Sequence, residues 1–183
     1  MAVIIDRVGP LEISVEPDLW RSLVGAIVGQ QLSVAAARTI RGRVAALGSN
    51  HFPTPAEILA VPEDVLRGAG LSRAKVAYVR DLAARWEAGE LDPEAITKLP
   101  DEEVIERLVR VKGIGRWTAE MVLIFSMGRP DVFAVDDLGL RIGAQRAYDL
   151  PERPDKVELM RIGEAWRPYR SVASLYLWRA HDG

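Results

Sequence analysis

Two glycines, Gly113 and Gly115, are separated by a single residue in the segment VKGIGRWTAEMVLIF, just before a run of apolar residues at helical spacing. Glycine is costly inside a helix but useful where the backbone turns sharply or approaches another group closely. The main-chain amides of such a turn, at the N-terminus of a helix, favour an anion such as a phosphate. Lys112 and Arg116 flank this anion site, and Ile114 is expected to fill the groove between the two helices. The same spacing would equally suit a tight helix–helix connection that binds no ligand.

Two adjacent carboxylates, Asp136 and Asp137, come just before a second predicted helix, LGLRIGAQRAY. One of them is expected to cap this helix, and capping alone would be a sufficient structural reason for an aspartate there. The other could face a cleft, where a carboxylate stabilises developing positive charge or orients a water molecule. From the residues alone, the assignment of these roles stays open, and so does capping without chemistry.

Helices along almost the whole chain are expected to position these residues. Capping residues followed by apolar residues at helical spacing recur, for example at Asp18 and Ser33. The hairpin is predicted over 102–127, with its first helix at Glu102–Val111 and its second from Arg116 to about Met127. Because there is no βαβ alternation, the predicted fold is all-α with about nine or ten helices. The opening segment VIIDRVGPLEISVEPD alternates weakly and contains prolines, so we expect a short irregular or β-like lead-in there.

The overall composition excludes several classes of protein. Of the 183 residues, 49% are hydrophobic and 27% are charged, as in ordinary globular proteins. There is no stretch of about 20 apolar residues and no signal-peptide pattern, so a cytoplasmic protein without membrane contact is expected. The absence of cysteine excludes disulfides, thiolate metal sites and cysteine-ligated iron–sulfur clusters. A net charge of −2 weakens the case for nucleic-acid binding, although Arg110, Lys112 and Arg116 gather around the double-glycine turn.

Several segments together resemble one family. LVRVKGIGRWTAEMVL is similar to the helix-hairpin-helix of the base-excision DNA glycosylases, and MGRPDVFAVDDLGLR is similar to the Gly/Pro-rich loop and aspartate that follow it there. IVGQQLS, GLSRAKVAYVRDLA and WRPYRSVASLYLW extend the resemblance, over roughly 19–180, to the DNA-3-methyladenine glycosylase II (AlkA-like) branch. The resemblance implies one HhH-GPD glycosylase module over 1–183, with an active-site cleft between two lobes. Lobe one would cover about 24–130, and lobe two would combine 1–23 with 131–183.

The resemblance also implies an activity. The protein would flip alkylated purines such as 3-methyladenine out of double-stranded DNA and hydrolyse the N-glycosidic bond. Asp137 matches the catalytic carboxylate, with Asp136 as the backup, and would stabilise the oxocarbenium-like charge on the deoxyribose. Trp117 stands where bifunctional relatives carry a Schiff-base lysine, which favours a monofunctional enzyme without AP-lyase activity. The alternative function is a non-catalytic helix-hairpin-helix module that binds DNA.

The base pocket and the DNA wedge are likewise implied by the resemblance. Trp117, Met121 and Trp178 match positions that line the base pocket, where a cationic base stacked on indole gains about 1–2 kcal/mol. Gln31, with Gln30 beside it, matches the residue that enters the duplex and fills the gap left by the flipped nucleotide. The alternatives are core packing for the tryptophans and capping of neighbouring helix ends for the glutamines.

The remaining expectations concern supporting residues and ligands. Arg170 and Ser171, in the segment RPYRS, are expected to support the aspartate loop or a phosphate. No redox cofactor is expected to be required, and the resemblance implies a monovalent cation, Na⁺ or K⁺, at hairpin carbonyls that the sequence does not identify. The expected partner is double-stranded DNA with damaged bases, bound by a monomer.

Overall fold

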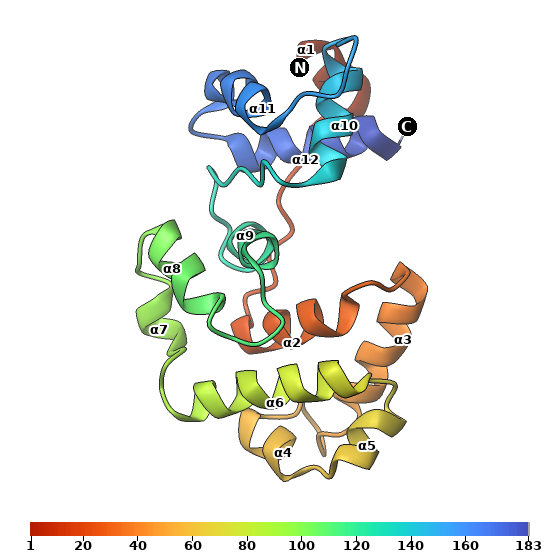
Figure 1. Ribbon diagram of the computed structural model, residues 1–183, viewed down its shortest axis with the longest axis vertical. Coiled ribbons are helices and arrows are strands. Elements are labelled where there is room, and N and C mark those ends of the chain that lie inside the picture. The colour runs from red at the N-terminus through yellow and green to blue at the C-terminus, as the bar shows by residue number, and fades with distance from the viewer. Residues whose placement is uncertain (183) are drawn as a thin grey trace. The chain divides into compact units, whose positions relative to one another are not determined.

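The structure is a computed structural model that describes residues 1–182 (Figure 1). Over this range the chain forms twelve α-helices and one 3-10 helix and no strand, which confirms the all-α prediction. It divides into two compact units. The central unit is Pro17–Val122, and the terminal unit combines Met1–Glu16 with the chain from Leu123 onward. The lobes predicted from the sequence placed these boundaries at about 24 and 130. No helix in residues 1–182 is long and apolar enough to cross a membrane.

The central unit is built around α6 (Arg73–Glu87), which carries buried aliphatic residues at helical spacing. This helix packs against α2 (Leu19–Gly29), α4 (Pro55–Ala60) and α5 (Glu63–Gly68), and Figure 1 shows it running between α2 and the two shorter helices. Helix α2 also packs against α3. The other helices that lie wholly in this unit are α2 (Leu19–Gly29), α3 (Val34–Ala45), α4 (Pro55–Ala60), α5 (Glu63–Gly68), α7 (Pro93–Ile96) and α8 (Asp101–Leu108).

Side-chain caps begin α2 and α3 where the sequence predicts them. The Asp18 carboxylate accepts a hydrogen bond from the Arg21 amide at 3.0 Å, and the Ser33 hydroxyl accepts one from the Ala36 amide at 3.3 Å. Each cap satisfies an amide that has no partner inside its helix. The two caps therefore fix where α2 and α3 begin.

Helices α8 and α9 (Arg116–Phe125) form the predicted helical hairpin. The first helix ends at Leu108 rather than at the predicted Val111, because the chain closes into tight turns there. The Val111 amide donates to the Leu108 carbonyl at 3.1 Å, and the Ile114 amide donates to the Val111 carbonyl at 3.1 Å. The connection between the helices is therefore longer than the four residues KGIG.

The terminal unit is organised by α10 (Leu138–Ala147) and α12 (Arg170–Asp182), which pack closely against each other. Gly143 allows this approach, because a Cβ atom there would overlap the main chain of Leu177. Helix α11 (Lys156–Gly163) runs into a 3-10 helix at Glu164–Trp166, and these two short elements complete the unit together with α1.

The N-terminal lead-in differs from the prediction. Ala2–Val8 forms helix α1, whereas the residues from there to Asp18 are neither helix nor strand. Ile4 and Val8 lie four residues apart, on one helical face, and pack in an apolar cluster with Tyr176 of α12. Burial of this face on α12 outweighs the strand preference of the β-branched residues, which had suggested a β-like segment.

Candidate functional site

The two glycines of the hairpin turn are in different environments. Gly113 has a φ of +81°, and a Cβ atom there would overlap the ring of Tyr78 on α6. Gly113 is therefore required by the fold itself. A Cβ atom at Gly115 would meet nothing within 4 Å, and Gly115 is not among the residues with positive φ. The fold places no comparable demand on Gly115, so its small size is available for close approach of a ligand.

Main-chain amides of the turn face different partners. The Lys112 amide donates to the Asp81 carboxylate at 3.0 Å. Within residues 1–182, the amides of Gly113 and Gly115 donate no hydrogen bond. These two donors lie at the N-terminal end of α9, where the helix dipole favours an anion. The side chain of Ile114, between them, is buried and fixes the turn.

The two cations predicted beside the turn are not equivalent. The Arg116 guanidinium donates to both carboxylate oxygens of Glu102, at 2.9 and 2.5 Å, and to Glu120 at 3.1 Å. The hydrogen bonds from Arg116 lower the pKa of Glu102 and raise that of Arg116, so both groups are charged and balanced. The Lys112 ammonium has a single, longer contact with Asp81, 3.7 Å, and its side chain is 69% exposed. Lys112 is therefore the cation better placed to meet an external anion.

The predicted wedge residues lie in residues 30–33, which we call the wedge turn, between α2 and α3. Gln31 is exposed and has a φ of +56°, a conformation that few non-glycine residues adopt. Gln30 is partly buried, and its side-chain amide donates to the Gly113 carbonyl at 2.7 Å. The central unit thus joins the wedge turn directly to the hairpin turn.

Asp137 is the N-cap of α10. Its Oδ1 atom accepts hydrogen bonds from the Leu140 amide at 2.7 Å and from the Trp178 indole N–H at 2.9 Å. A Cβ atom at Gly139 would lie 3.1 Å from both this oxygen and the indole ring, so glycine lets the ring approach the carboxylate. The capping role thus belongs to Asp137, the residue matched to the catalytic carboxylate, and two donors set its orientation.

Asp136, the backup candidate, is exposed and forms an ion pair with Lys156 at the start of α11. Its carboxylate is thus balanced by a cation at the surface, whereas that of Asp137 is partly buried and accepts hydrogen bonds from the Leu140 amide and the Trp178 indole. The two adjacent aspartates therefore differ in both burial and partners, and this difference favours Asp137 as the group that acts on a ligand.

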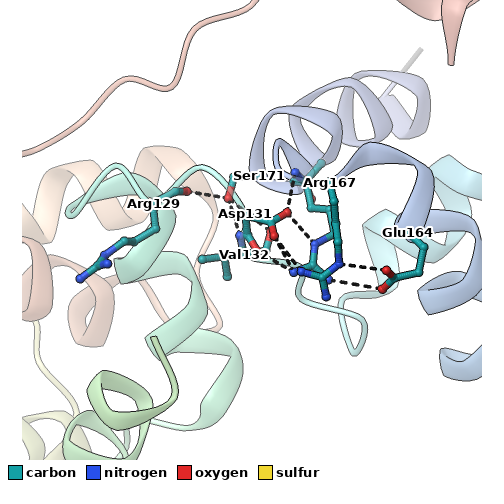
Figure 2. A network of polar contacts seen from close by, with 8 residues as sticks. Arg129, Asp131, Val132, Glu164, Arg167 and Ser171 are labelled. Atoms are coloured by element: carbon teal, nitrogen blue, oxygen red, sulfur yellow. Dashed lines mark hydrogen bonds and ion pairs between the residues drawn. The ribbon is translucent and has the colours of Figure 1, made fainter. Parts of the chain in front are cut away.

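A polar network holds residues 128–137, which we call the aspartate loop, against the start of α12 (Figure 2). Arg170 donates to Asp131 Oδ1 at 2.7 Å and to Asp131 Oδ2 at 2.9 Å, and Arg167 donates to the same carboxylate at 2.9 Å. Burial raises the pKa of Asp131, but the hydrogen bonds and charges of the two arginines outweigh it and hold that pKa below its ordinary value. Asp131 is therefore ionised and fixed.

Ser171 completes this network from the inside of the terminal unit. Its hydroxyl accepts a hydrogen bond from the Val132 amide at 2.9 Å and donates to the Arg129 carbonyl at 2.7 Å (Figure 2). The residue is fully buried, so the two bonds replace solvent for the main chain of the loop. Of the two roles expected for Arg170 and Ser171, the structure supports that of holding the aspartate loop.

The predicted pocket residues are divided between the two units. Trp117 and Met121 lie on α9 in the central unit, and Trp117 is 47% exposed. Trp178 lies on α12 in the terminal unit, where its ring packs near Phe125 with the centroids 5.9 Å apart. The pocket that these residues would form together stays a prediction. The indole N–H of Trp178 has a further contact that the sequence did not reveal, the hydrogen bond to Asp137.

Several residues around these turns were not identified from the sequence. They are held in place by contacts between distant segments, and they are Lys75, Tyr78, Asp81, Asp131 and Gly139. Only the glycines at 139 and 143 left a usable signal, because two glycines four residues apart inside a predicted helix mark a face that packs closely.

Main-chain oxygens are the groups of the hairpin that could hold a cation. No cluster of three or more His, Cys, Asp or Glu side chains suited to a metal occurs among residues 1–182. In that same range, the carbonyls of Val109, Arg110, Lys112 and Ile114 accept no hydrogen bond. Carbonyl oxygens can replace the hydration shell of a monovalent cation, so the turn has the chemistry that such an ion requires, and the cation itself stays a prediction.

Comparisons with known proteins agree along most of the chain. Residues 24–168 match the model of the HhH-GPD superfamily of base excision DNA repair proteins. The chain is 38% identical over 162 residues to DNA-3-methyladenine glycosylase 1 of Schizosaccharomyces pombe, which covers 87% of this chain and 71% of that protein. It is similar to the crystal structure of a Bacillus halodurans DNA-3-methyladenine glycosidase, with a TM-score of 0.90 and 41% identity over 98% of this chain and 83% of that one. For the S. pombe 3-methyladenine DNA glycosylase in complex with abasic DNA, the TM-score is 0.87 and the identity 36%, over 97% and 89%.

Proposed function

The chain belongs to the HhH-GPD superfamily of base excision DNA repair proteins, and we propose that it is a DNA glycosylase that releases alkylated purines from double-stranded DNA. The observation that carries the proposal is the Asp137 carboxylate, held by the Leu140 amide and the Trp178 indole in the loop that follows the hairpin. The names of the relatives, DNA-3-methyladenine glycosylases, support 3-methyladenine as the first substrate to test.

The hairpin supplies the grip on DNA in this proposal. The amides of Gly113 and Gly115 would bind a backbone phosphate, with the exposed ammonium of Lys112 beside it. Gly115 supports this role, because its missing side chain leaves open space that the fold itself does not fill. A phosphate on main-chain donors fixes the strand without reading its sequence, as a repair enzyme requires.

Release of an alkylated base requires a carboxylate that stabilises positive charge more than it requires a proton donor. When the bond between the base and C1′ breaks, its electron pair leaves with the base, so a cationic base such as 3-methyladenine departs neutral. Positive charge then develops on the deoxyribose, and the carboxylate of Asp137 would stabilise it. A water molecule adds to C1′ and loses its proton, with Asp137 placed to accept it or to orient the water. The products are the free base and an abasic site.

A monofunctional enzyme is the form of this activity that the residues favour. Trp117 occupies the position of the Schiff-base lysine, and α9 contains no lysine. Without an amine at that position, hydrolysis by water is the expected route, and the strand would stay uncut. Borohydride trapping should therefore give no covalent enzyme–DNA adduct, whereas a trapped adduct would restore the lyase mechanism.

A monovalent cation at the hairpin is a further element of the proposal. Main-chain carbonyls of the turn that accept no hydrogen bond would hold it, and its positive charge would add to the attraction for a phosphate. Replacing K⁺ or Na⁺ in the buffer by a bulky organic cation at equal ionic strength should then weaken DNA binding, whereas unchanged affinity would remove the cation from the proposal.

The decisive experiment replaces Asp137 by asparagine and measures base release from methylated duplex DNA. Asparagine keeps an oxygen that can accept both hydrogen bonds and remains a good N-cap, so Asp137→Asn removes mainly the charge. We expect the single-turnover rate to fall by about 10²–10³-fold while DNA affinity and thermal stability stay near the wild type. The control is Asp136→Asn, which removes the same charge one residue away and should leave the rate nearly unchanged.

Two results would contradict the proposal. If Asp137→Asn released 3-methyladenine at the wild-type rate, the catalytic assignment would be wrong. If the wild-type protein bound DNA but released no base from a panel of 3-methyladenine, 7-methylguanine, hypoxanthine and 1-methyladenine, the non-catalytic binding module would replace the enzyme. The same panel ranks the substrates.

A further inference from the structure

The two glutamines of the wedge turn have different tasks. Gln31 is exposed, and its positive φ turns the chain sharply just before the cap of α3. Gln30 is partly buried, and its side-chain amide donates to the Gly113 carbonyl of the hairpin turn at 2.7 Å. A glutamine committed to this bond cannot enter a DNA duplex without breaking it. The contact therefore separates a residue that can be inserted from a residue that holds the turn.

Lys75, at the start of α6, holds the same turn from its other side. Its ammonium donates to the Val28 carbonyl at 2.8 Å and to the Gln30 carbonyl at 2.7 Å, at the C-terminal end of α2. A cation at this end of a helix satisfies carbonyls that have no partner inside the helix and opposes the helix dipole favourably. Burial lowers the pKa of Lys75, because removal from water disfavours the charged ammonium.

The hairpin turn rests on the next turns of the same helix. The ring of Tyr78 occupies the space where Gly113 would carry a side chain, and the Asp81 carboxylate accepts the Lys112 amide at 3.0 Å. Lys75, Tyr78 and Asp81 therefore connect α6 to the wedge turn and to the hairpin turn, and Gln30 links the two turns directly. All of these contacts lie within the central unit.

We propose that Gln30 and Lys75 are positioning residues, which fix the wedge turn against the hairpin so that Gln31 alone enters the duplex. The inference rests on the proposed glycosylase function, because it concerns how the damaged nucleotide leaves the stack. The hairpin holds a phosphate and the wedge must fill the gap that opens near it, so the two have to sit at a fixed separation. A misplacement of 1 Å at such a site can cost about 10²-fold in rate.

The test compares neighbouring glutamines on two duplexes. In one duplex, the paired duplex, the 3-methyladenine is opposite thymine. In the other, which we call the gapped duplex, the opposite strand carries an abasic site, so the lesion has no pairing partner and its extrusion costs less. We expect Gln30→Ala and Gln31→Ala each to slow single-turnover release from the paired duplex by roughly ten-fold, the effect of one lost hydrogen bond. Both variants should recover most of the rate on the gapped duplex. The double variant should be no slower than Gln31→Ala, because both changes affect one step.

Lys75→Met tests the other contact, with Lys98→Met as the matched control at an exposed position. Lys75→Met should show the same rescue on the gapped duplex, and Lys98→Met should behave as the wild type on both. A 2-aminopurine placed beside the lesion reports extrusion directly, and its fluorescence gain on binding should fall in Gln30→Ala and Lys75→Met. Gln30→Ala leaves the contacts of Lys75 with α2 intact, so it remains informative even if Lys75→Met fails to fold.

Distinct outcomes separate this inference from the function on which it rests. Equal losses on both duplexes would mean that Gln30 only supports the fold, and they would overturn the positioning role. Wild-type rates for Gln30→Ala on the paired duplex, or losses that multiply in the double variant, would overturn it as well. A wild-type protein that releases no base from either duplex would instead contradict the proposed glycosylase itself.

Discussion

Helices α6 and α12 each hold one turn of the candidate site in their own unit, but they do so with different chemistry. In the central unit, side chains of α6 contact the main chain of the hairpin turn. The Asp81 carboxylate accepts a hydrogen bond from the Lys112 amide, and the Tyr78 ring lies against Gly113. In the terminal unit, side chains of α12 contact side chains of the aspartate loop. Arg170 donates a hydrogen bond to Asp131, and Trp178 donates one to Asp137. The first arrangement positions amides, and the second positions a carboxylate.

The two turns are therefore sensitive to different kinds of substitution. A turn that works through its backbone depends on residues with no side chain, so added atoms should harm it most. A loop that works through one carboxylate depends on the groups that orient it, so lost hydrogen bonds should harm it most. We therefore expect hairpin variants to change DNA binding or stability, and aspartate-loop variants to change the rate of base release.

The largest expected effect is at the hairpin glycines. Gly113→Ala places a methyl group against the Tyr78 ring at a φ of +81°, and it should lower the free energy of unfolding by about 2–4 kcal/mol. Gly115→Ala meets open space and should change stability by less than about 1 kcal/mol while weakening DNA binding. Urea denaturation and fluorescence anisotropy measure the two quantities. If Gly115→Ala bound DNA as well as the wild type, the anion site would not lie at this turn.

The next effect is at the aspartate loop. Trp178→Phe keeps an aromatic ring but removes the indole N–H that donates to Asp137 at 2.9 Å. The single-turnover rate of base release should fall by roughly ten-fold, because one hydrogen bond no longer orients the carboxylate. The dissociation constant for duplex DNA should stay the same, which distinguishes this variant from Gly115→Ala. A change in affinity with an unchanged rate would assign Trp178 to DNA contact instead.

The sequence predicted local features of the fold better than the contacts that join distant segments. Asp18 and Ser33 are predicted caps that the structure confirms, because capping depends on residues three positions apart. The network of Asp131 with Arg170 joins residues 39 positions apart, and the contact of Gln30 with Gly113 joins residues 83 positions apart. No local pattern encodes such pairs. Helix α1 was missed for a related reason, since Ile4 and Val8 form a helical face only because α12 is there to cover it.

A smaller effect concerns acid stability of the aspartate loop. The pKa of Asp131 is held below its ordinary value in the folded protein, so its contribution to stability is complete above the unfolded value of about 4. That contribution is lost as the pH falls through the folded pKa. In Asp131→Asn, the free energy of unfolding should be lower near pH 7 and should decline less steeply below pH 4. Chemical denaturation between pH 7 and 2 tests this, with the exposed Asp64→Asn as the control.

The smallest expected effect is on the salt dependence of DNA binding by the hairpin. Each phosphate contact by a cation contributes about 0.9 to the slope of log K against log salt concentration. Lys112→Gln should reduce the slope by about 1, because the Lys112 ammonium is exposed and only loosely paired with Asp81. Arg116→Gln should leave the slope nearly unchanged, since its guanidinium is already occupied by Glu102 and Glu120. Equal reductions in both variants would mean that DNA draws Arg116 away from its carboxylates, and the hairpin would then depend on side-chain charge as well as on its main-chain amides.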